Sequence, residues 1–283
     1  MLTNLFYRLY VPFASAVQLP LILAAFLSPR SGHDYGVTLG QKLRLLGRLR
    51  RARRRVATAT HLLEQTTMLG SLLRVPPKQR GCVVECGTFK GGSAIALSLA
   101  CELTGRELHI FDSFAGLPAP KGSDAAHLLP ATATVHTYTE GAFRGTREEV
   151  EANLERWGAK PVCRLHEGFF AVSLPAFRER CVMAFLDVDL VDSLKTCLRY
   201  LWPLLEDGAV LFTHEAPHME IAKVFFDDRW WQDVLGIAAP GLIGAGSGLG
   251  LVASIGHSRS DLGYAIKNPN RAAYEVVPQR GNP

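Results

Sequence analysis

Val83-Val84-Glu85-Cys86-Gly87-Thr88-Phe89-Lys90-Gly91-Gly92-Ser93 is a short apolar run that leads directly into three glycines. Residues 82–84 are apolar and β-branched enough for a buried strand, and residues 94–103 carry apolar side chains at helical spacing. The glycines therefore lie in a strand-to-helix turn. Gly87 can adopt the positive φ that such a turn needs, and Gly91 and Gly92 let a ligand approach the start of the helix.

A second apolar run, residues 108–111, ends at Asp112, 25 residues after Gly87. An acid at this position can accept hydrogen bonds from both hydroxyls of a ribose. Strand, glycine turn, second strand and terminal acid together predict a nucleotide-containing ligand. A dinucleotide site would favour Gly-x-Gly-x-x-Gly, which this turn lacks, and the Glu85 carboxylate would repel a pyrophosphate. Glu85 could instead hold the ammonium group of S-adenosylmethionine, directly or through water, so this cofactor is favoured over NAD.

Three segments carry a resemblance to a known family. They are residues 85–93, the run Asp112-Ser113-Phe114-Ala115-Gly116-Leu117-Pro118, and the run Leu186-Asp187-Val188-Asp189-Leu190-Val191-Asp192-Ser193. In their order and spacing the chain resembles the macrocin O-methyltransferases, the TylF/MycF-type family, over about residues 80–230. The resemblance implies a class I methyltransferase fold, S-adenosylmethionine as methyl donor, and a divalent metal that organises a sugar or polyketide-glycoside hydroxyl.

Strand and helix signals alternate along the rest of the chain. We expect strands over 162–165, 182–186 and 209–212, helices that begin at Thr146, at Asp192 or Ser193 and over 220–231, and a long loop over 119–145. Repeated β–α units predict an α/β protein with a doubly wound, mostly parallel, Rossmann-like sheet. We expect one methyltransferase domain, residues 76–283, after an N-terminal apolar and basic helical arm, residues 1–75.

Ligands of such sheets bind beyond the carboxyl ends of the strands, which is where the candidate cofactor residues lie. Glu85, Gly87, Gly91 and Ser93 are expected to hold the methionine end of S-adenosylmethionine, and Asp112 the ribose. The full set of candidates is Glu85, Gly87, Thr88, Gly91, Gly92, Ser93, Asp112, Ser113, Glu167 and Gly168.

Polar residues also follow the next two strands. Asp187 and Asp189 end one strand, and His214 and Glu215 follow the other, 27 and 28 residues after Asp187. Asp187, His214 and Glu215 are therefore a candidate divalent metal site, for Mg²⁺ or Mn²⁺, although a histidine suits Mg²⁺ less well. The family pattern has two adjacent aspartates where this chain has His214-Glu215, so only Asp187 matches directly. The alternative is that these residues cap helices and bind the cofactor.

Methyl transfer to a hydroxyl needs a general base. By resemblance, Asp189 corresponds to the acid that serves as the base in some family members. His136, in the expected loop, is a second candidate because a neutral imidazole titrates in the right range.

The N-terminal arm raises the question of membrane attachment. No charge interrupts residues 9–29, and eight lysines and arginines without an acid follow within residues 42–55. This pattern favours a cytoplasmic protein attached to the cytoplasmic face of a membrane through residues 1–55. The alternative is a helical arm packed on a partner subunit, with the arginines in solvent; we expect a homo-oligomer. Nothing accompanies the arginines that indicates nucleic-acid binding.

Composition agrees with a cytosolic enzyme. The chain has 283 residues, of which 48% are hydrophobic, and a net charge of +5. Its six cysteines lie in or beside expected strands and helices, as buried thiols would. The sequence predicts an S-adenosylmethionine-dependent O-methyltransferase that acts on a hydroxyl of a sugar, glycoside or glycolipid-type metabolite, assisted by a divalent metal. A metal-independent methyltransferase and a non-catalytic membrane-associated scaffold are the alternatives.

Overall fold

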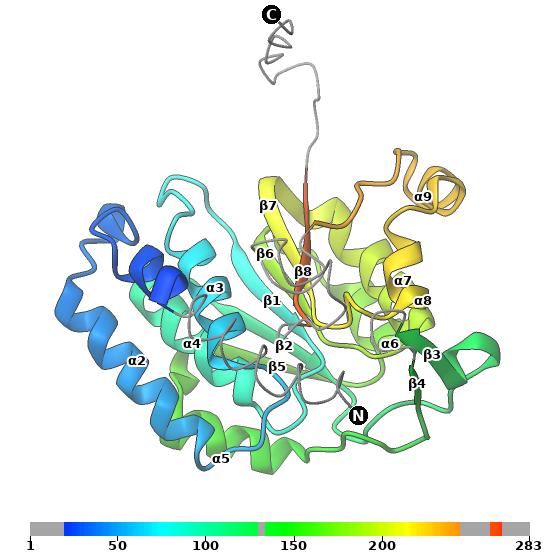
Figure 1. Ribbon diagram of the computed structural model, residues 1–283, viewed down its shortest axis with the longest axis horizontal. Coiled ribbons are helices and arrows are strands. Elements are labelled where there is room, and N and C mark those ends of the chain that lie inside the picture. The colour runs from blue at the N-terminus through cyan, green and yellow to red at the C-terminus, as the bar shows by residue number, and fades with distance from the viewer. Residues whose placement is uncertain (1–19, 130–133, 244–260, 268–283) are drawn as a thin grey trace, which may run out of the picture.

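The computed structural model describes residues 20–129, 134–243 and 261–267. A six-stranded sheet with the order β5-β2-β1-β6-β7-β8 forms its centre (Figure 1). The strands are β1 (Cys82–Cys86), β2 (Leu108–Asp112), β5 (Cys163–Glu167), β6 (Cys181–Leu186), β7 (Leu205–Thr213) and β8 (Gly263–Ile266). Only β8 at the edge runs antiparallel to its neighbour, so the expected Rossmann-like, mostly parallel sheet is confirmed.

Helices cover both faces of the sheet (Figure 1). One group comprises α2 (Leu39–Arg53), α3 (Leu62–Leu72), α4 (Gly92–Thr104) and α5 (Arg147–Trp157); the other comprises α6 (Phe170–Ser173), α7 (Val191–Leu201), α8 (Met219–Val224) and α9 (Asp228–Leu235). Short 3-10 helices span His33–Tyr35, Gly122–Ala125, Lys160–Val162, Leu174–Ala176 and Trp202–Leu204. Successive strand residues point to opposite faces of the sheet. Val83 packs in the core with α2 to α5, and Val84 packs in the core with α7 to α9.

The basic helix α2 packs on its own chain. Leu45, Leu49 and Ala52 are buried in the same core as α3 and α4. The Arg48 guanidinium donates from Nη2 to the carbonyl of Gly158 at 2.9 Å. The apolar face of α2 is thus used within the protein. Arg44, Arg50 and Arg51 are exposed, whereas the half-buried Arg53 donates to the carbonyl of Thr60.

Residues 9–19 of the uncharged N-terminal stretch fall outside the described residues, and residues 20–27 are helical. Among the helices of the described ranges, none combines the length and apolar character needed to span a bilayer.

Two expectations about the extent of secondary-structure elements are wrong. The expected loop over 119–145 contains an antiparallel hairpin of β3 (Ala126–Leu129) and β4 (Thr134–Thr137). The hairpin is held to the domain at β3, where the Leu128 N–H donates to Glu220 at 2.8 Å. The expected helix over 220–231 is two helices, α8 and α9, because Asp227 accepts a hydrogen bond from the Trp230 N–H at 3.1 Å and starts a new helix.

The start of α7 also differs from the expectation, because neither Asp192 nor Ser193 is its cap. The helix begins at Val191, and the cap residue is Leu190, whose side chain cannot accept a hydrogen bond. Asp124 from the 3-10 helix Gly122–Ala125 supplies the acceptors instead, with its carboxylate 2.7 Å from the Val191 N–H and 3.0 Å from the Asp192 N–H. By contrast, Thr146 caps α5 as expected, accepting from the Glu149 N–H at 3.2 Å. All six cysteines are free and buried.

Candidate functional site

A cavity of about 710 Å³ lies at the carboxyl ends of the parallel strands. Residues after β1, β2, β5, β6 and β7 line it, together with the hairpin β3–β4 and residues 57–59, which connect α2 to α3. Its size is within the range of small-molecule sites, and its position is the one at which α/β sheets bind ligands.

The glycine turn brings two strands into contact at the floor of this cavity. Gly87 has a φ of 81°, and a Cβ at this position would overlap the carbonyl oxygen of Asp187. The Asp187 N–H in turn donates to the Cys86 carbonyl at 2.9 Å. Only glycine therefore allows the ends of β1 and β6 to lie this close together, which is the crevice where the sequence predicts the cofactor.

Asp112 lies at the end of β2 and lines the cavity, as expected. Its two carboxylate oxygens accept hydrogen bonds at 2.7 Å, one from the Thr88 N–H and the other from the Phe114 N–H. Burial raises the pKa of Asp112, whereas these backbone hydrogen bonds act in the opposite direction. The carboxylate is thus held in a fixed orientation by the two loops that follow β1 and β2.

Glu85 lies beneath the turn and not in the cavity lining. Its side chain is fully buried, Oε2 accepts from the Thr88 hydroxyl at 3.1 Å, and Oε1 has no hydrogen-bond partner. Burial raises the pKa of Glu85 to about 8. The side chain therefore contacts the glycine turn from below, where the hydroxyls of Thr88 and Ser93 partly offset the effect of burial on its pKa.

The other predicted cofactor residues differ in whether they line the cavity. Ser113 lines the cavity beside Gly87 and Asp112, while Thr88, Gly91, Gly92 and Ser93 form the turn and first residues of α4 behind the lining. At the end of β5, Glu167 is exposed and pairs with Arg147 at 3.3 Å. Gly168 donates its N–H to the Asp112 carbonyl at 2.9 Å, and Phe169 and Phe170, which follow it, line the cavity.

The structure brings together the three predicted metal ligands. Oxygen or nitrogen atoms of Asp187, His214 and Glu215 all lie within 4.8 Å of one another, and all three side chains line the cavity. His214 Nδ1 is 3.5 Å from Asp187 Oδ1, and His214 Nε2 is 3.3 Å from Oε2 of Glu64, a buried residue of α3. The imidazole therefore lies between two carboxylates, one of which comes from the N-terminal helices.

The electrostatics of this group follow from that arrangement. Burial on its own would lower the pKa of His214, but the carboxylates of Asp187 and Glu64 raise it well above 6.5. The same contacts hold the pKa values of Asp187 and Glu64 below their ordinary values against the effect of burial. Glu215 differs, since burial and the nearby aspartates raise its pKa well above 4.5. Carboxylates outnumber the single histidine here, and a divalent cation would balance that excess of negative charge.

Asp189 also lines the cavity, two residues from Asp187. Its φ is 60°, a backbone conformation that few residues other than glycine adopt, and its N–H donates to Glu215 Oε1 at 3.3 Å. Burial and the Asp187 charge raise the pKa of Asp189 to about 7. Phe89 and Phe143 in the lining also have positive φ, so unusual backbone conformations gather around this cavity.

His136 lies on the exposed strand β4 and lines the cavity near two other polar rings. Its ring centroid is 4.6 Å from that of Tyr138 and 5.6 Å from that of His218, and the Tyr138 hydroxyl is 3.0 Å from His218 Nδ1. Burial, reinforced by the neighbouring histidines, lowers the pKa of His218 to about 4. The hairpin segment and the residue before α8 thus bring three polar rings together in the cavity lining.

Several residues at the site have no signal in the sequence. Glu64 contacts His214 through Oε2, and its Oε1 accepts a hydrogen bond from the Asp261 N–H at 2.8 Å. Asp261 lies next to strand β8, and Tyr138 belongs to the segment that reads as a loop. Glu64 also accepts the His61 N–H at 2.6 Å in a capping box. Such a box can predict where the helix starts, but not that Glu64 contacts His214.

Comparisons with known proteins agree with this geometry. The family model for macrocin O-methyltransferase (TylF) matches residues 75–232, more than half of the chain. The O-methyltransferase NovP is similar in structure, with 17% identity and a TM-score of 0.51 over 74% of this chain and 83% of NovP. The calicheamicin methyltransferase CalS11 gives 17% identity and a TM-score of 0.52 over 80% of this chain and 92% of CalS11. No curated protein sequence matches the chain significantly.

The two structural neighbours share the fold, and the family match covers the glycine turn, Asp112, and the Asp187 to Glu215 group. The chain therefore belongs to the macrocin O-methyltransferase (TylF) family and is an S-adenosylmethionine-dependent O-methyltransferase.

Proposed function

We propose that this O-methyltransferase methylates a hydroxyl of a sugar, glycoside or glycolipid-type metabolite, with a divalent metal at the acceptor. The observation that carries the proposal is the group of buried or half-buried acids and one histidine in the same cavity as Asp112. Asp112 would bind the ribose of S-adenosylmethionine, and the acids on the neighbouring strands would face the acceptor. CalS11, one of the structural neighbours, is itself a TDP-rhamnose 3'-O-methyltransferase.

We assign the metal to Asp187, His214 and Glu215. Two carboxylates and one imidazole within 4.8 Å suit a divalent cation, with Mn²⁺ a better match than Mg²⁺ for a set that includes a histidine. When bound, such a cation supplies Lewis acidity that lowers the pKa of an acceptor hydroxyl. His214 must give up its proton to bind it, with Glu64 holding the opposite ring nitrogen in place.

Asp189 is the general base in this proposal. The acceptor oxygen forms a bond to the methyl carbon as the carbon–sulfur bond breaks, and the hydroxyl proton passes to Asp189. A pKa of about 7 suits a base that works near neutral pH, and the positive φ orients the carboxylate into the cavity lining. His136, which lines the same cavity, is the second candidate base.

We propose that the remaining cofactor contacts follow the strand order. Gly87 and the residues that follow it would accommodate the methionine end, with Glu85 acting from beneath the turn through Thr88. Ser113 would lie beside the ribose, and the region of Glu167 and Gly168 after β5 would bound the adenine end, where Phe169 and Phe170 offer apolar area.

The experiment measures S-adenosylmethionine binding by calorimetry on the full chain, then methyl transfer from labelled cofactor to a panel of nucleotide sugars and glycosides. Binding that is lost in Asp112→Ala, together with transfer that EDTA abolishes and Mn²⁺ restores, would support the proposal. Transfer unaffected by EDTA would favour the metal-independent alternative. Transfer to acceptors that contain no sugar, with none to glycosides, would refute the acceptor class.

Membrane attachment through residues 1–55 is a separate hypothesis, supported by the exposed Arg44, Arg50 and Arg51 of α2. Sedimentation of the full chain with vesicles that contain anionic lipid tests it, and an unchanged supernatant fraction at low salt would refute it. The expected homo-oligomer is a prediction that light scattering can test.

A further inference from the structure

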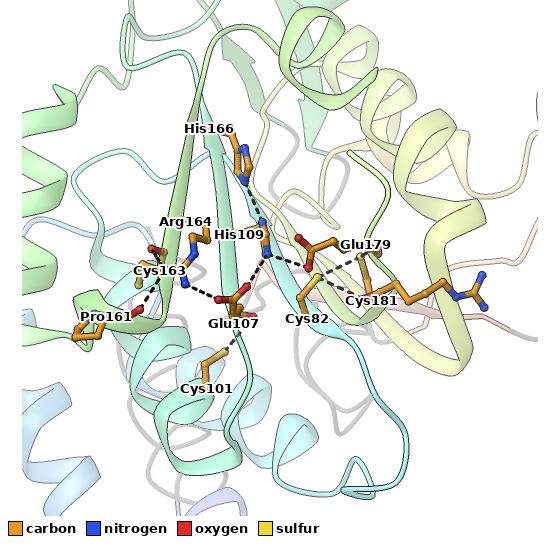
Figure 2. A network of polar contacts seen from close by, with 11 residues as sticks. Cys82, Cys101, Glu107, His109, Pro161, Cys163, Arg164, His166, Glu179 and Cys181 are labelled. Atoms are coloured by element: carbon orange, nitrogen blue, oxygen red, sulfur yellow. Dashed lines mark hydrogen bonds and ion pairs between the residues drawn. The ribbon is translucent and has the colours of Figure 1, made fainter. Parts of the chain in front are cut away.

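A second cluster of potential metal ligands lies at the opposite end of the sheet, where the strands begin. Cys82 is the first residue of β1, His109 the second residue of β2, and Glu179 precedes β6. Ligand atoms of these three residues all lie within 4.8 Å of one another. Figure 2 shows their side chains gathered together with those of Glu107 and Cys181. None of them lines the cavity with Asp112.

His109 is placed as a ligand would be. The residue is only 3% exposed, and its Nε2 atom is buried without a hydrogen-bond partner. That nitrogen lies 3.4 Å from the Glu179 carboxylate and 3.6 Å from the Glu107 carboxylate. A buried ring nitrogen that faces two carboxylates without a proper hydrogen bond is costly on its own, and a cation between these groups would satisfy all of them.

The other ring nitrogen of His109 is already engaged. Nδ1 lies 2.9 Å from Nε2 of His166, so a proton on Nδ1 can be donated to His166 and leaves the lone pair on Nε2 (Figure 2). Metal-binding histidines commonly have their second nitrogen fixed by such a hydrogen bond.

The two thiols have a spacing that suits a tetrahedral ion. Cys82 and Cys181 are paired in adjacent parallel strands, and their sulfur atoms are 3.8 Å apart. With Zn–S bonds of about 2.3 Å, a tetrahedral site separates two sulfur ligands by about 3.8 Å. The thiols otherwise have only backbone carbonyls as acceptors, those of Arg180 for Cys82 and of Glu179 for Cys181.

We propose that Cys82, His109 and Glu179 bind a Zn²⁺ ion. Cys181, whose sulfur lies 3.8 Å from that of Cys82 but outside this group of mutual 4.8 Å distances, would turn toward the ion as the fourth ligand. Thiolate and imidazole ligands favour Zn²⁺ over Mg²⁺ or Mn²⁺, whereas the predicted catalytic site contains no sulfur. Binding would convert both thiols to thiolates and release their protons. A cavity of about 440 Å³, lined by Cys82, Glu107 and Glu179 among others, connects the cluster to solvent and provides an entry path.

Such an ion would act on stability and not on the methyl transfer. It would join β1, β2 and the segment before β6, three neighbours in the sheet order, at the ends remote from the cofactor. Closing these strand ends with one ion adds its binding free energy to that of folding. We therefore expect Zn²⁺ to raise the melting temperature of the full chain.

Cobalt substitution tests the site, because Co²⁺ bound to thiolate has a near-ultraviolet charge-transfer band that oxygen and nitrogen ligands do not produce. The full chain, reduced with a phosphine and stripped of metal, is titrated with Co²⁺ and then Zn²⁺. We expect a thiolate band that saturates at one equivalent and disappears as Zn²⁺ displaces Co²⁺. The same band should appear in an Asp187→Asn variant, which makes the result independent of the proposed catalytic metal.

Variants locate the ligands. The double variant Cys82→Ser/Cys181→Ser should abolish the band, and Cys82→Ser alone should weaken it, whereas Cys197→Ser, which alters an equally buried thiol on α7, should leave it unchanged. Glu179→Gln should weaken Zn²⁺ binding at least tenfold, and Glu102→Gln is its control because the two side chains have similar exposure, 55% and 53%. Absence of a thiolate band, or an undiminished band in the Cys82→Ser/Cys181→Ser variant, would overturn the proposal. A reduced protein that takes up no metal and forms a Cys82–Cys181 disulfide in air would overturn it too.

Discussion

Glu85 should make the protein less stable as the pH rises, and Glu85→Gln should remove that dependence. The carboxyl is fully buried, one of its oxygens has no partner, and burial raises its pKa from 4.5 to about 8. Between these two pH values the folded state holds a proton that the unfolded chain has already lost. Stability is therefore greatest below pH 4.5 as far as this group is concerned, and declines as the pH rises toward 8.

The size of the effect follows from the same values. Each pKa unit corresponds to about 1.4 kcal/mol, so the wild-type protein should lose about 4 kcal/mol between pH 5 and pH 9 relative to Glu85→Gln. The amide has nearly the same shape and does not titrate, so other ionisable groups cancel in the difference. Two pairs of denaturation curves, wild type and variant at each pH, give the quantity directly.

An exposed carboxylate provides the control. Glu155→Gln makes the same chemical change on the solvent side of α5 and should not produce a pH-dependent difference of this size. Parallel stability profiles for wild type and Glu85→Gln would refute the reasoning, because they would mean that Glu85 is equally well solvated in the folded and unfolded states. Addition of S-adenosylmethionine at pH 9 should reduce the difference if its ammonium group reaches Glu85.

Three further predictions concern the site. Asp112→Ala should weaken S-adenosylmethionine binding more than tenfold in calorimetry, since charged hydrogen bonds to two hydroxyls contribute about 1.5–3 kcal/mol each, and equal affinity would contradict the assignment. Gly87→Ala should destabilise the fold by more than about 3 kcal/mol in chemical denaturation, because its Cβ would overlap the Asp187 carbonyl. Gly105→Ala, at a φ of 65° with open space around it, should cost about 1 kcal/mol. Similar losses in the two variants would refute the steric argument. The turnover rate with saturating acceptor should rise through about pH 7 as Asp189 loses its proton, and Asp189→Asn should lower it at least a hundredfold; a variant with the wild-type profile would exclude Asp189 as the base.

The N-terminal helices show that a local sequence pattern does not predict which surface a helix packs against. Residues 42–55 read as a basic segment directed toward a membrane or a partner. In the structure, however, Leu45 and Leu49 are buried against the protein's own α3 and α4. Helical spacing reveals that a helix has an apolar face, but not which surface covers it. The division into an arm, residues 1–75, and a domain, residues 76–283, stays a prediction.

The sequence by itself determined the parts of this protein that depend on short-range order. Apolar runs of strand length, the glycines after β1 and the acid at the end of β2 are local features, and parallel strands necessarily bring their carboxyl ends to one edge. The sequence alone therefore predicts that Asp187, His214 and Glu215 lie together. The family resemblance rests on the same local segments.

Only the tertiary structure decided which distant residues complete these groups. Glu64 meets His214 across 150 positions of sequence, Asp124 supplies the hydrogen-bond acceptors for α7, and His109 meets Cys82 and Glu179 at the amino ends of the strands. No periodicity encodes such contacts, because they depend on how helices pack on the sheet and how deeply each side chain is buried. Burial also sets the pKa values of Glu85 and Asp189, since loss of water, and not residue type, determines the free energy of the charge.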